Sequence, residues 1–132
     1  MPKLLIINGH DTYESSPGHL NQTMVEVMRE ELKDKFEIQI SVLKDGYETE
    51  EERRKFLEAD VIIYQMPVFW FAAPALLKKY MEDGVFTVYP NSFVYVERTL
   101  ENGSGIRTRR ASDRQKIYAV NNLERSGGSF RQ

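Results

Sequence analysis

Two loops hold the residues whose types could do chemistry, and the first is residues 9–18. Ser15 and Ser16 offer hydroxyl donors there, and Gly18 lets the backbone approach a ligand closely. A helix expected to begin near His19 would direct free backbone N–H groups and the positive end of its dipole at this loop. These features suit an anion such as a phosphate group, but an ordinary capped helix start would contain the same residues.

The second loop, within residues 65–74, is unusually apolar. Pro67 ends the strand before it, because proline has no N–H group to give to a neighbouring strand. Four bulky side chains then stand where a surface loop is expected: Val68, Phe69, Trp70 and Phe71. They could pack under a neighbouring loop or a second subunit, or they could line a slot for a flat, apolar ligand ring.

Several kinds of chemistry are excluded or disfavoured by what the sequence contains. With no cysteine, the chain has no thiolate nucleophile, disulfide or cysteine-ligated metal. Two histidines are too few for a histidine cluster, so no metal site is predicted. The first loop matches neither the Gly-x-Gly-x-x-Gly dinucleotide fingerprint nor a P-loop. The remaining ligand that fits both loops is nucleotide-like with an aromatic ring, and flavin is our best hypothesis.

Alternating strands and helices must position these loops. Residues 3–8 and 61–64 are continuous apolar runs, typical of parallel strands buried on both faces, while residues 36–43 alternate as an edge strand does. Amphipathic helices follow each strand, and Thr49 with Glu52 predicts a capping box for the second helix. The order predicts a three-layer α/β fold with a parallel sheet. If strand 3 lies beside strand 1, with strand 2 on its other side, the two loops flank one crevice, where such sheets bind ligands.

The length and composition fit one domain with a real core. The chain has 132 residues, of which 41% are hydrophobic. It has no long apolar run and no signal-peptide pattern, so we expect a cytoplasmic protein without a membrane span. Residues 1–60 are acidic in sum and residues 61–132 are basic. A basic tail can bind nucleic acid, but this one has little aromatic interleaving, so nucleic acid is not favoured as a partner.

At these residues the chain resembles the flavodoxin-like NAD(P)H quinone reductases, most closely the modulator of drug activity B group. The resemblance spans residues 3–88, and the pieces that carry it are Leu5-Ile6-Ile7-Asn8-Gly9, Ser16-x-Gly18-x-Leu20-Asn21, Phe56-Leu57-x-Ala59-Asp60-Val61 and Gln65-Met66-Pro67-x-Phe69-Trp70-x-x-Ala73-Pro74. It implies a flavodoxin-like fold, a homodimer, and FAD in preference to FMN. The implied reaction passes a hydride from NAD(P)H through the flavin to a quinone.

The same resemblance implies the site residues. Hydride transfer needs no protein nucleophile, since the cofactor does the chemistry, so we predict no catalytic residue. By position, the FAD phosphates would be held by His10, Ser16, Gly18 and Leu20. The isoalloxazine ring would be lined by Pro67, Val68, Phe69, Trp70 and Phe71.

Residues 106–132 depart from the family. The family continues with a Gly-Lys-Lys-Tyr-Met strand and a Trp-Asn-Ala-Pro flavin loop, whereas this stretch is basic and aperiodic, as disordered tails are. If each codon is read one base later, the residues allowed from Ile106 onward fit the family throughout. Shifted glycine codons also become arginine codons. We hypothesise that residues 106–132 are a frameshifted reading; a divergent natural tail is the alternative.

This hypothesis predicts a flavodoxin-like domain over residues 1–105, with three strands and three helices, followed by an irregular basic tail. The third strand would become an exposed edge, and the flavin pocket would lack one wall. The leading functional prediction is an FAD-dependent NAD(P)H:quinone oxidoreductase whose activity in this chain is in doubt. The alternatives are a non-catalytic flavin-binding electron carrier and a binding module that uses the arginine-rich tail.

Overall fold

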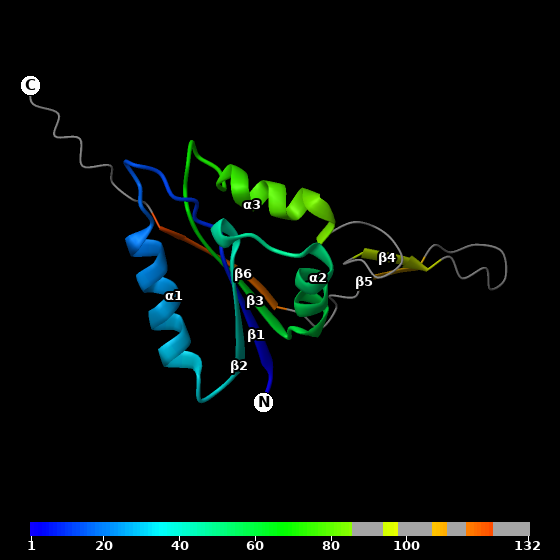
Figure 1. Cartoon of the computed structure of the whole chain (residues 1–132). Helices are drawn as coiled ribbons and strands as arrows, with labels where there is room; N and C mark the ends of the chain where they lie inside the picture. The colour runs from blue at the N-terminus through cyan, green and yellow to red at the C-terminus, as the bar shows by residue number, and fades with distance from the viewer. Residues whose placement is uncertain (86–93, 98–106, 111–115, 123–132) are drawn as a thin grey trace, which may run out of the picture.

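The protein folds around a parallel β-sheet. A computed structural model of the chain describes residues 1–85, 94–97, 107–110 and 116–122. The sheet has the strand order β2-β1-β3-β6 (Figure 1). Its strands are β1 (Lys3–Asn8), β2 (Glu37–Val42), β3 (Val61–Pro67) and β6 (Lys116–Asn122).

Helices cover both faces of this sheet. The helix α1 (His19–Leu32) follows β1, α2 (Thr49–Glu58) precedes β3, and α3 (Ala75–Tyr80) follows β3. A 3₁₀ turn η1 (Leu43–Asp45) ends β2, and a π-helical turn η2 (Met81–Val85) continues α3. Two further strands, β4 (Val94–Glu97) and β5 (Arg107–Arg110), form a separate antiparallel pair.

Each face of the sheet has its own apolar core. On the α1 face, Leu4 and Ile6 of β1 pack with Val25 of α1, together with partly buried residues that include Val61 and Ile63 of β3. On the opposite face, alternate strand residues such as Ile7 and Ile62 pack with the helical residues Phe56, Leu77 and Tyr80. Because side chains alternate along a strand, the continuous apolar runs fill both cores. The three-layer, flavodoxin-like architecture predicted from the sequence is confirmed.

The predicted strand order is confirmed, and one prediction about the tail is wrong. β1 lies between β2 and β3, with β2 at the edge, as the alternation in residues 36–43 indicated. The tail, however, is not irregular throughout. β6 pairs in parallel with β3 along its whole length, so β3 is an interior strand and not the exposed edge we expected. Lys-Ile-Tyr-Ala-Val-Asn-Asn contains β-branched and aromatic residues that fit a strand, and the basic stretch around it obscured them.

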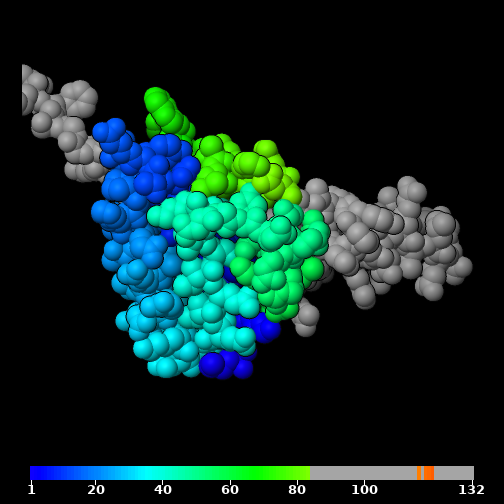
Figure 2. All heavy atoms as spheres, in the orientation of Figure 1, coloured from blue at the N-terminus to red at the C-terminus, as the bar shows by residue number. Residues whose placement is uncertain are grey.

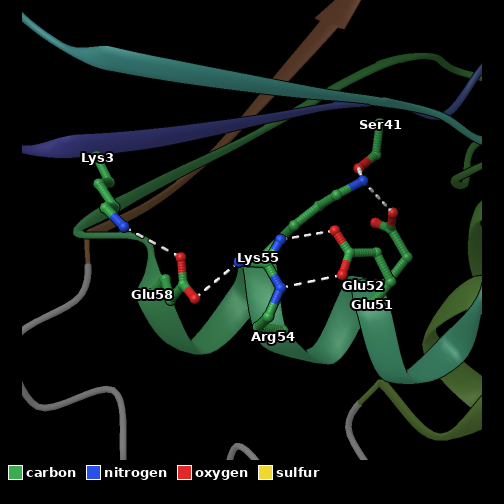
Figure 3. A network of polar contacts seen from close by, with 7 residues as sticks. All are labelled: Lys3, Ser41, Glu51, Glu52, Arg54, Lys55 and Glu58. Atoms are coloured by element: carbon green, nitrogen blue, oxygen red, sulfur yellow. Dashed lines mark hydrogen bonds and ion pairs between the residues drawn. The ribbon is translucent and has the colours of Figure 1, made fainter.

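The predicted capping box is also wrong, for a physical reason that concerns Glu52. Glu48 is the N-cap residue of α2, and it makes no side-chain capping hydrogen bond. Glu52 is 3% exposed and points inward: its carboxylate accepts hydrogen bonds from the Tyr80 hydroxyl at 3.0 Å and from Lys55 Nζ at 2.7 Å. Lys55 also donates to Ser41 of β2, which ties α2 to the sheet (Figure 3). A buried carboxylate requires such partners.

An exposed chain of charges runs along the outer side of the same helix. Arg54 pairs with both Glu51 and Glu58, and Glu58 pairs in turn with Lys3 at the start of β1 (Figure 3). Separately, no helix in the described part of the chain is long and apolar enough to cross a membrane.

Candidate functional site

The two loops singled out from the sequence meet at the carboxyl ends of β1 and β3. These strands are direct neighbours, with Asn8 paired to Gln65 at their ends. The loop after β1, residues 9–18, begins with a hydrogen bond from the Gly9 N–H group to the Gln65 carbonyl at 2.9 Å. We call residues 9–18 the β1 loop and residues 68–73 the aromatic loop. Because β1 and β3 are neighbours, the two loops lie side by side at the carboxyl-terminal end of the sheet, as predicted.

His10 connects the two loops. It is 3% exposed, and its backbone N–H donates to Asn8 Oδ1 at 3.2 Å. Its ring Nε2 lies within hydrogen-bonding distance of Ser16 Oγ, at 3.2 Å. The His10 ring also meets Phe69 edge-to-face, with centroids 5.7 Å apart, and Tyr13 meets Phe69 in the same way. The β1 loop therefore holds one side chain of the aromatic loop between two of its own rings.

Gly18 is required by both its backbone and its surroundings. Its φ of 88° lies in the left-handed region, and a Cβ atom there would sit 2.8 Å from His10 Nδ1. Gly18 is the N-cap residue of α1, which makes no side-chain capping hydrogen bond and has no acidic residue in its first turn. The first-turn N–H groups are thus not covered by a capping side chain, and no carboxylate of that turn opposes an anion.

Strained backbone exposes the tip of the aromatic loop. Trp70 and Phe71 have φ values of 49° and 63°, which bulky residues rarely adopt. The backbone groups of Phe69 and Ala72 hydrogen-bond to each other and close a tight turn around them. Trp70 is 93% exposed and Phe71 is 99% exposed, and the segment after β3 projects from the surface (Figure 2). The turn therefore presents two large apolar side chains to whatever binds there.

The predicted site residues fall into two groups. The structure brings four of them together through the contacts described above, namely His10, Ser16, Gly18 and Phe69. Pro67 is buried and Val68 is half-buried beside them, whereas Leu20, Trp70 and Phe71 are exposed. No walled slot around Trp70 and Phe71 is formed by the described residues. The assignment of these nine residues to a flavin stays a prediction.

Sequence reasoning missed four residues that organise this region. Asn8, Asn21 and Gln65 form a buried set of amides beneath the loops, and Tyr13 packs on Phe69. One signal could have found the amides: each stands where the pattern of its strand or helix calls for an apolar residue. A polar side chain at such a position is buried only with partners. Tyr13, in a polar loop, gives no such signal.

The other electrostatic features lie away from these loops. Burial and the neighbouring Glu52 raise the pKa of the Tyr80 hydroxyl, and burial raises that of Tyr64. No group of three or more histidine, cysteine, aspartate or glutamate residues that could hold a metal ion occurs within residues 1–85 or the described strands after them. The β1 loop and the aromatic loop thus provide backbone donors, hydroxyls and aromatic surface, and these suit binding more than proton transfer.

Comparison with known proteins agrees with this fold. A family profile described as "Flavodoxin-like fold" matches residues 2–113, and the chain belongs to that family. An uncharacterised protein of Schizosaccharomyces pombe is 40% identical over 86 residues, which are 64% of this chain and 43% of that protein. The NADPH:quinone oxidoreductase MdaB of Haemophilus influenzae is 33% identical over 81 residues, 61% of this chain and 42% of MdaB.

A solved structure of an azoreductase from Bacillus anthracis shares the fold, with a TM-score of 0.58 and 15% identity. That likeness covers 92% of this chain and 68% of the azoreductase. The chain spans less than half the length of the two curated relatives named above. The predicted resemblance to the flavodoxin-like quinone reductases is confirmed.

Proposed function

We propose that this chain is an FAD-binding, NAD(P)H-dependent quinone oxidoreductase by descent, which works as a homodimer in the cytoplasm. The observation that carries the proposal is the junction of the β1 loop and the aromatic loop through His10, Ser16 and Phe69. The β1 loop suits a phosphate and the aromatic loop suits a flat ring, and the two loops follow neighbouring strands. The relation to a protein named NADPH:quinone oxidoreductase supports the same reaction class.

The residues present fit the parts of FAD. The N-terminus of α1 carries no side-chain cap and no acidic residue in its first turn, and Gly18 keeps the backbone accessible, which suits the diphosphate. Ser16 would donate to a phosphate oxygen beside His10. Phe69, Trp70 and Phe71 offer aromatic surface to the isoalloxazine ring. FAD, when bound, supplies the hydride chemistry between NAD(P)H and the acceptor.

The protein's part in this reaction is to bind and orient. The buried ring of His10 and the half-buried ring of Phe69 fix the relative position of the two loops, and the exposed Trp70 and Phe71 would keep water from one side of a bound ring. Hydride transfer needs no nucleophile on the protein, so we assign the Ser16 hydroxyl beside the His10 ring to binding. We therefore assign binding and positioning roles here and no catalytic side chain.

A second subunit would explain the exposure of the aromatic loop. Two large apolar side chains that are more than nine-tenths exposed are unusual on a monomer surface, and a partner that covers them would offset the cost. We propose that Trp70 and Phe71 lie at the homodimer interface beside the flavin.

Titration of the purified chain with FAD tests the proposal. We expect only weak FAD binding by isothermal titration calorimetry and slow quinone-dependent oxidation of NADPH or NADH, because the family's Trp-Asn-Ala-Pro flavin loop is missing from this chain. Trp70→Ala should weaken FAD binding and dimerisation, whereas Leu57→Ala, a partly exposed residue of α2, should change neither. Tight FMN binding without NAD(P)H oxidation would favour the electron-carrier alternative. Binding of neither flavin would refute the proposal for this chain and leave only the ancestry.

We also propose that residues 106–132 are a frameshifted reading of the family's sequence. The strand β6 occupies Lys116–Asn122, where the residues that a shifted reading allows include Lys-Tyr-Met-Leu-Ser-Thr-Thr. Resequencing the gene from the codon of Val85 past the stop codon decides between the readings. We expect one base to separate this sequence from a frame that encodes Trp-Asn-Ala-Pro. If resequencing finds no base change and no codons for Trp-Asn-Ala-Pro, the basic tail is the natural sequence and the frameshift proposal is wrong.

A further inference from the structure

Three buried amides join the two strand ends that carry the loops. Asn8 is the last residue of β1, Asn21 lies in the first turn of α1, and Gln65 lies near the end of β3. Asn21 and Gln65 are 0% exposed and Asn8 is 3% exposed. Asn21 Nδ2 donates to Asn8 Oδ1 at 2.8 Å, and Gln65 Nε2 donates to Asn21 Oδ1 at 3.1 Å. We call these three residues the amide clamp.

The clamp continues without a break into the β1 loop. Asn8 Oδ1 accepts a second hydrogen bond, from the backbone N–H of His10, and His10 contacts Ser16. A path of hydrogen bonds therefore runs from β3 through Asn21 and Asn8 to the hydroxyl proposed to meet a phosphate. Breaking any link would release the backbone of His10 or the start of α1.

Gln65 links the clamp to the aromatic loop. Its backbone carbonyl accepts from the Gly9 N–H group at 2.9 Å and from Asn21 Nδ2 at 3.4 Å, while its side chain reaches Asn21. Pro67 and the aromatic loop follow two residues later. The same residue is thus held to β1, to α1 and to the start of the aromatic loop, so a shift of one loop must move the other.

We propose that Asn8, Asn21 and Gln65 are positioning residues that set the spacing between the β1 loop and the aromatic loop, and hence between the phosphate and ring ends of a bound flavin. This inference rests on the proposed function. Amides suit the role because each supplies a donor and an acceptor without a charge beneath an anion. A carboxylate in any of the three positions would repel the phosphate it helps to place.

Two measurements on Asn21→Leu and Gln65→Leu test the clamp, with Tyr80→Phe as the matched control. Tyr80→Phe also removes a buried side-chain hydrogen bond, but on the opposite face of the sheet. The first measurement is hydrogen exchange of peptides from residues 9–18 and 66–74 without ligand. We expect exchange to rise in both peptides of the clamp variants and in neither peptide of the control.

The second measurement is the Kd for FAD. We expect this Kd to rise by about tenfold in the clamp variants, which is the effect of losing one well-formed hydrogen bond. In Tyr80→Phe the Kd should rise clearly less, even if that variant loses as much stability as the clamp variants or more. Exchange that rises in residues 9–18 alone, or equal losses of affinity in variants and control, would overturn the proposal. If the unmodified chain binds no FAD, the proposed function fails, and the exchange result alone supports or overturns the coupling of the loops.

Discussion

The two faces of the sheet carry polar networks made of different chemical groups. On the α1 face, the amide clamp is neutral, wholly buried and directly beneath the candidate site. On the α2 face, the polar contacts are charged: Glu52 pairs with Lys55 in the interior, and Arg54, Glu51 and Glu58 form a separate, exposed set of ion pairs on the same helix (Figure 3). The comparison indicates that neutral amides can position the candidate site without placing a charge beneath it. The charged groups lie on the opposite face, where they affect only the stability of the fold.

The largest expected effect is the loss of Glu52 from the charged network. Glu52→Ala leaves Lys55 partly buried without its carboxylate and the Tyr80 hydroxyl without its acceptor. We expect the free energy of unfolding to fall by about 3 kcal/mol, as when one partner of a buried ion pair is removed. Urea titration followed by circular dichroism measures the change.

The conservative variant Glu52→Gln keeps an acceptor for Tyr80 and should lose clearly less stability than Glu52→Ala. Equal losses in the two variants would show that shape, and not hydrogen bonding, determines the effect. Neither variant should alter the affinity of the residual folded protein for FAD, because the network lies on the other face of the sheet.

A charge placed in the neutral network should have the converse effect. Asn8→Asp keeps the Oδ1 acceptor for Asn21 and His10 but adds a negative charge beneath the proposed phosphate site. We expect the Kd for FAD to rise by about tenfold through repulsion of the diphosphate. Riboflavin, which has no phosphate, is the matched ligand, and its affinity should change much less. Equal changes for both ligands would contradict an electrostatic cause.

The pH dependence of stability should also differ between the two faces of the sheet. Burial, with Asp83 next in importance, raises the pKa of Tyr47 to about 12, and the pKa values of Tyr64 and Tyr80 are also raised by burial. Between pH 10 and 12 the folded chain therefore keeps protons that the unfolded chain has lost, so stability falls as the pH rises. All three tyrosines lie on the α2 face.

Tyr47→Phe tests this expectation. The variant removes one of the three titrations, so the decline in stability above pH 10 should be less steep than in the unmodified chain, as measured by urea titration at several pH values. Leu57→Ala, which changes a partly exposed residue of α2 that carries no titratable group, is the control and should leave the slope as it was. An unchanged slope for Tyr47→Phe would contradict the assignment.

The smallest effect is expected in the exposed set of ion pairs on α2. Arg54→Ala removes the pairs with Glu51 and Glu58, but all three groups are in contact with water, which screens them. We expect no measurable change in the urea midpoint at physiological salt. A clear loss would mean that the exposed charges act cooperatively with Lys3 and the start of β1.

The sequence was a good guide to elements with a strong hydrophobic period. The apolar runs of β1 and β3, the alternation of β2 and the amphipathic α1 predicted the layers and the strand order, because burial on one or two faces dictates those patterns. It failed at β6, where Lys116–Asn122 is short and surrounded by arginines, so no pattern extends far enough to be recognised. It failed again at Glu52, whose partner Tyr80 is remote in sequence.

The features of the candidate site also divide into those that the sequence predicted and those that it could not. Gly18 and the start of α1 could be predicted, since a glycine before an amphipathic helix is a local signal. The contact of His10 with Phe69 depends on strands that meet only in the fold, and so does the link from Asn21 to Gln65 across 44 residues. Trp70 and Phe71 are exposed among the described residues, which local sequence does not reveal, and their place beside a flavin ring stays a prediction.

The exposure of Trp70 has a spectroscopic consequence. Trp70 is the chain's single tryptophan and is 93% exposed, so its intrinsic emission should be that of an indole ring in water. Anything that stacks on the aromatic loop, whether an isoalloxazine ring or a second subunit, would move that emission to shorter wavelength or quench it. The chain thus carries a built-in optical reporter at the tip of its candidate site, with no second tryptophan to compete with it.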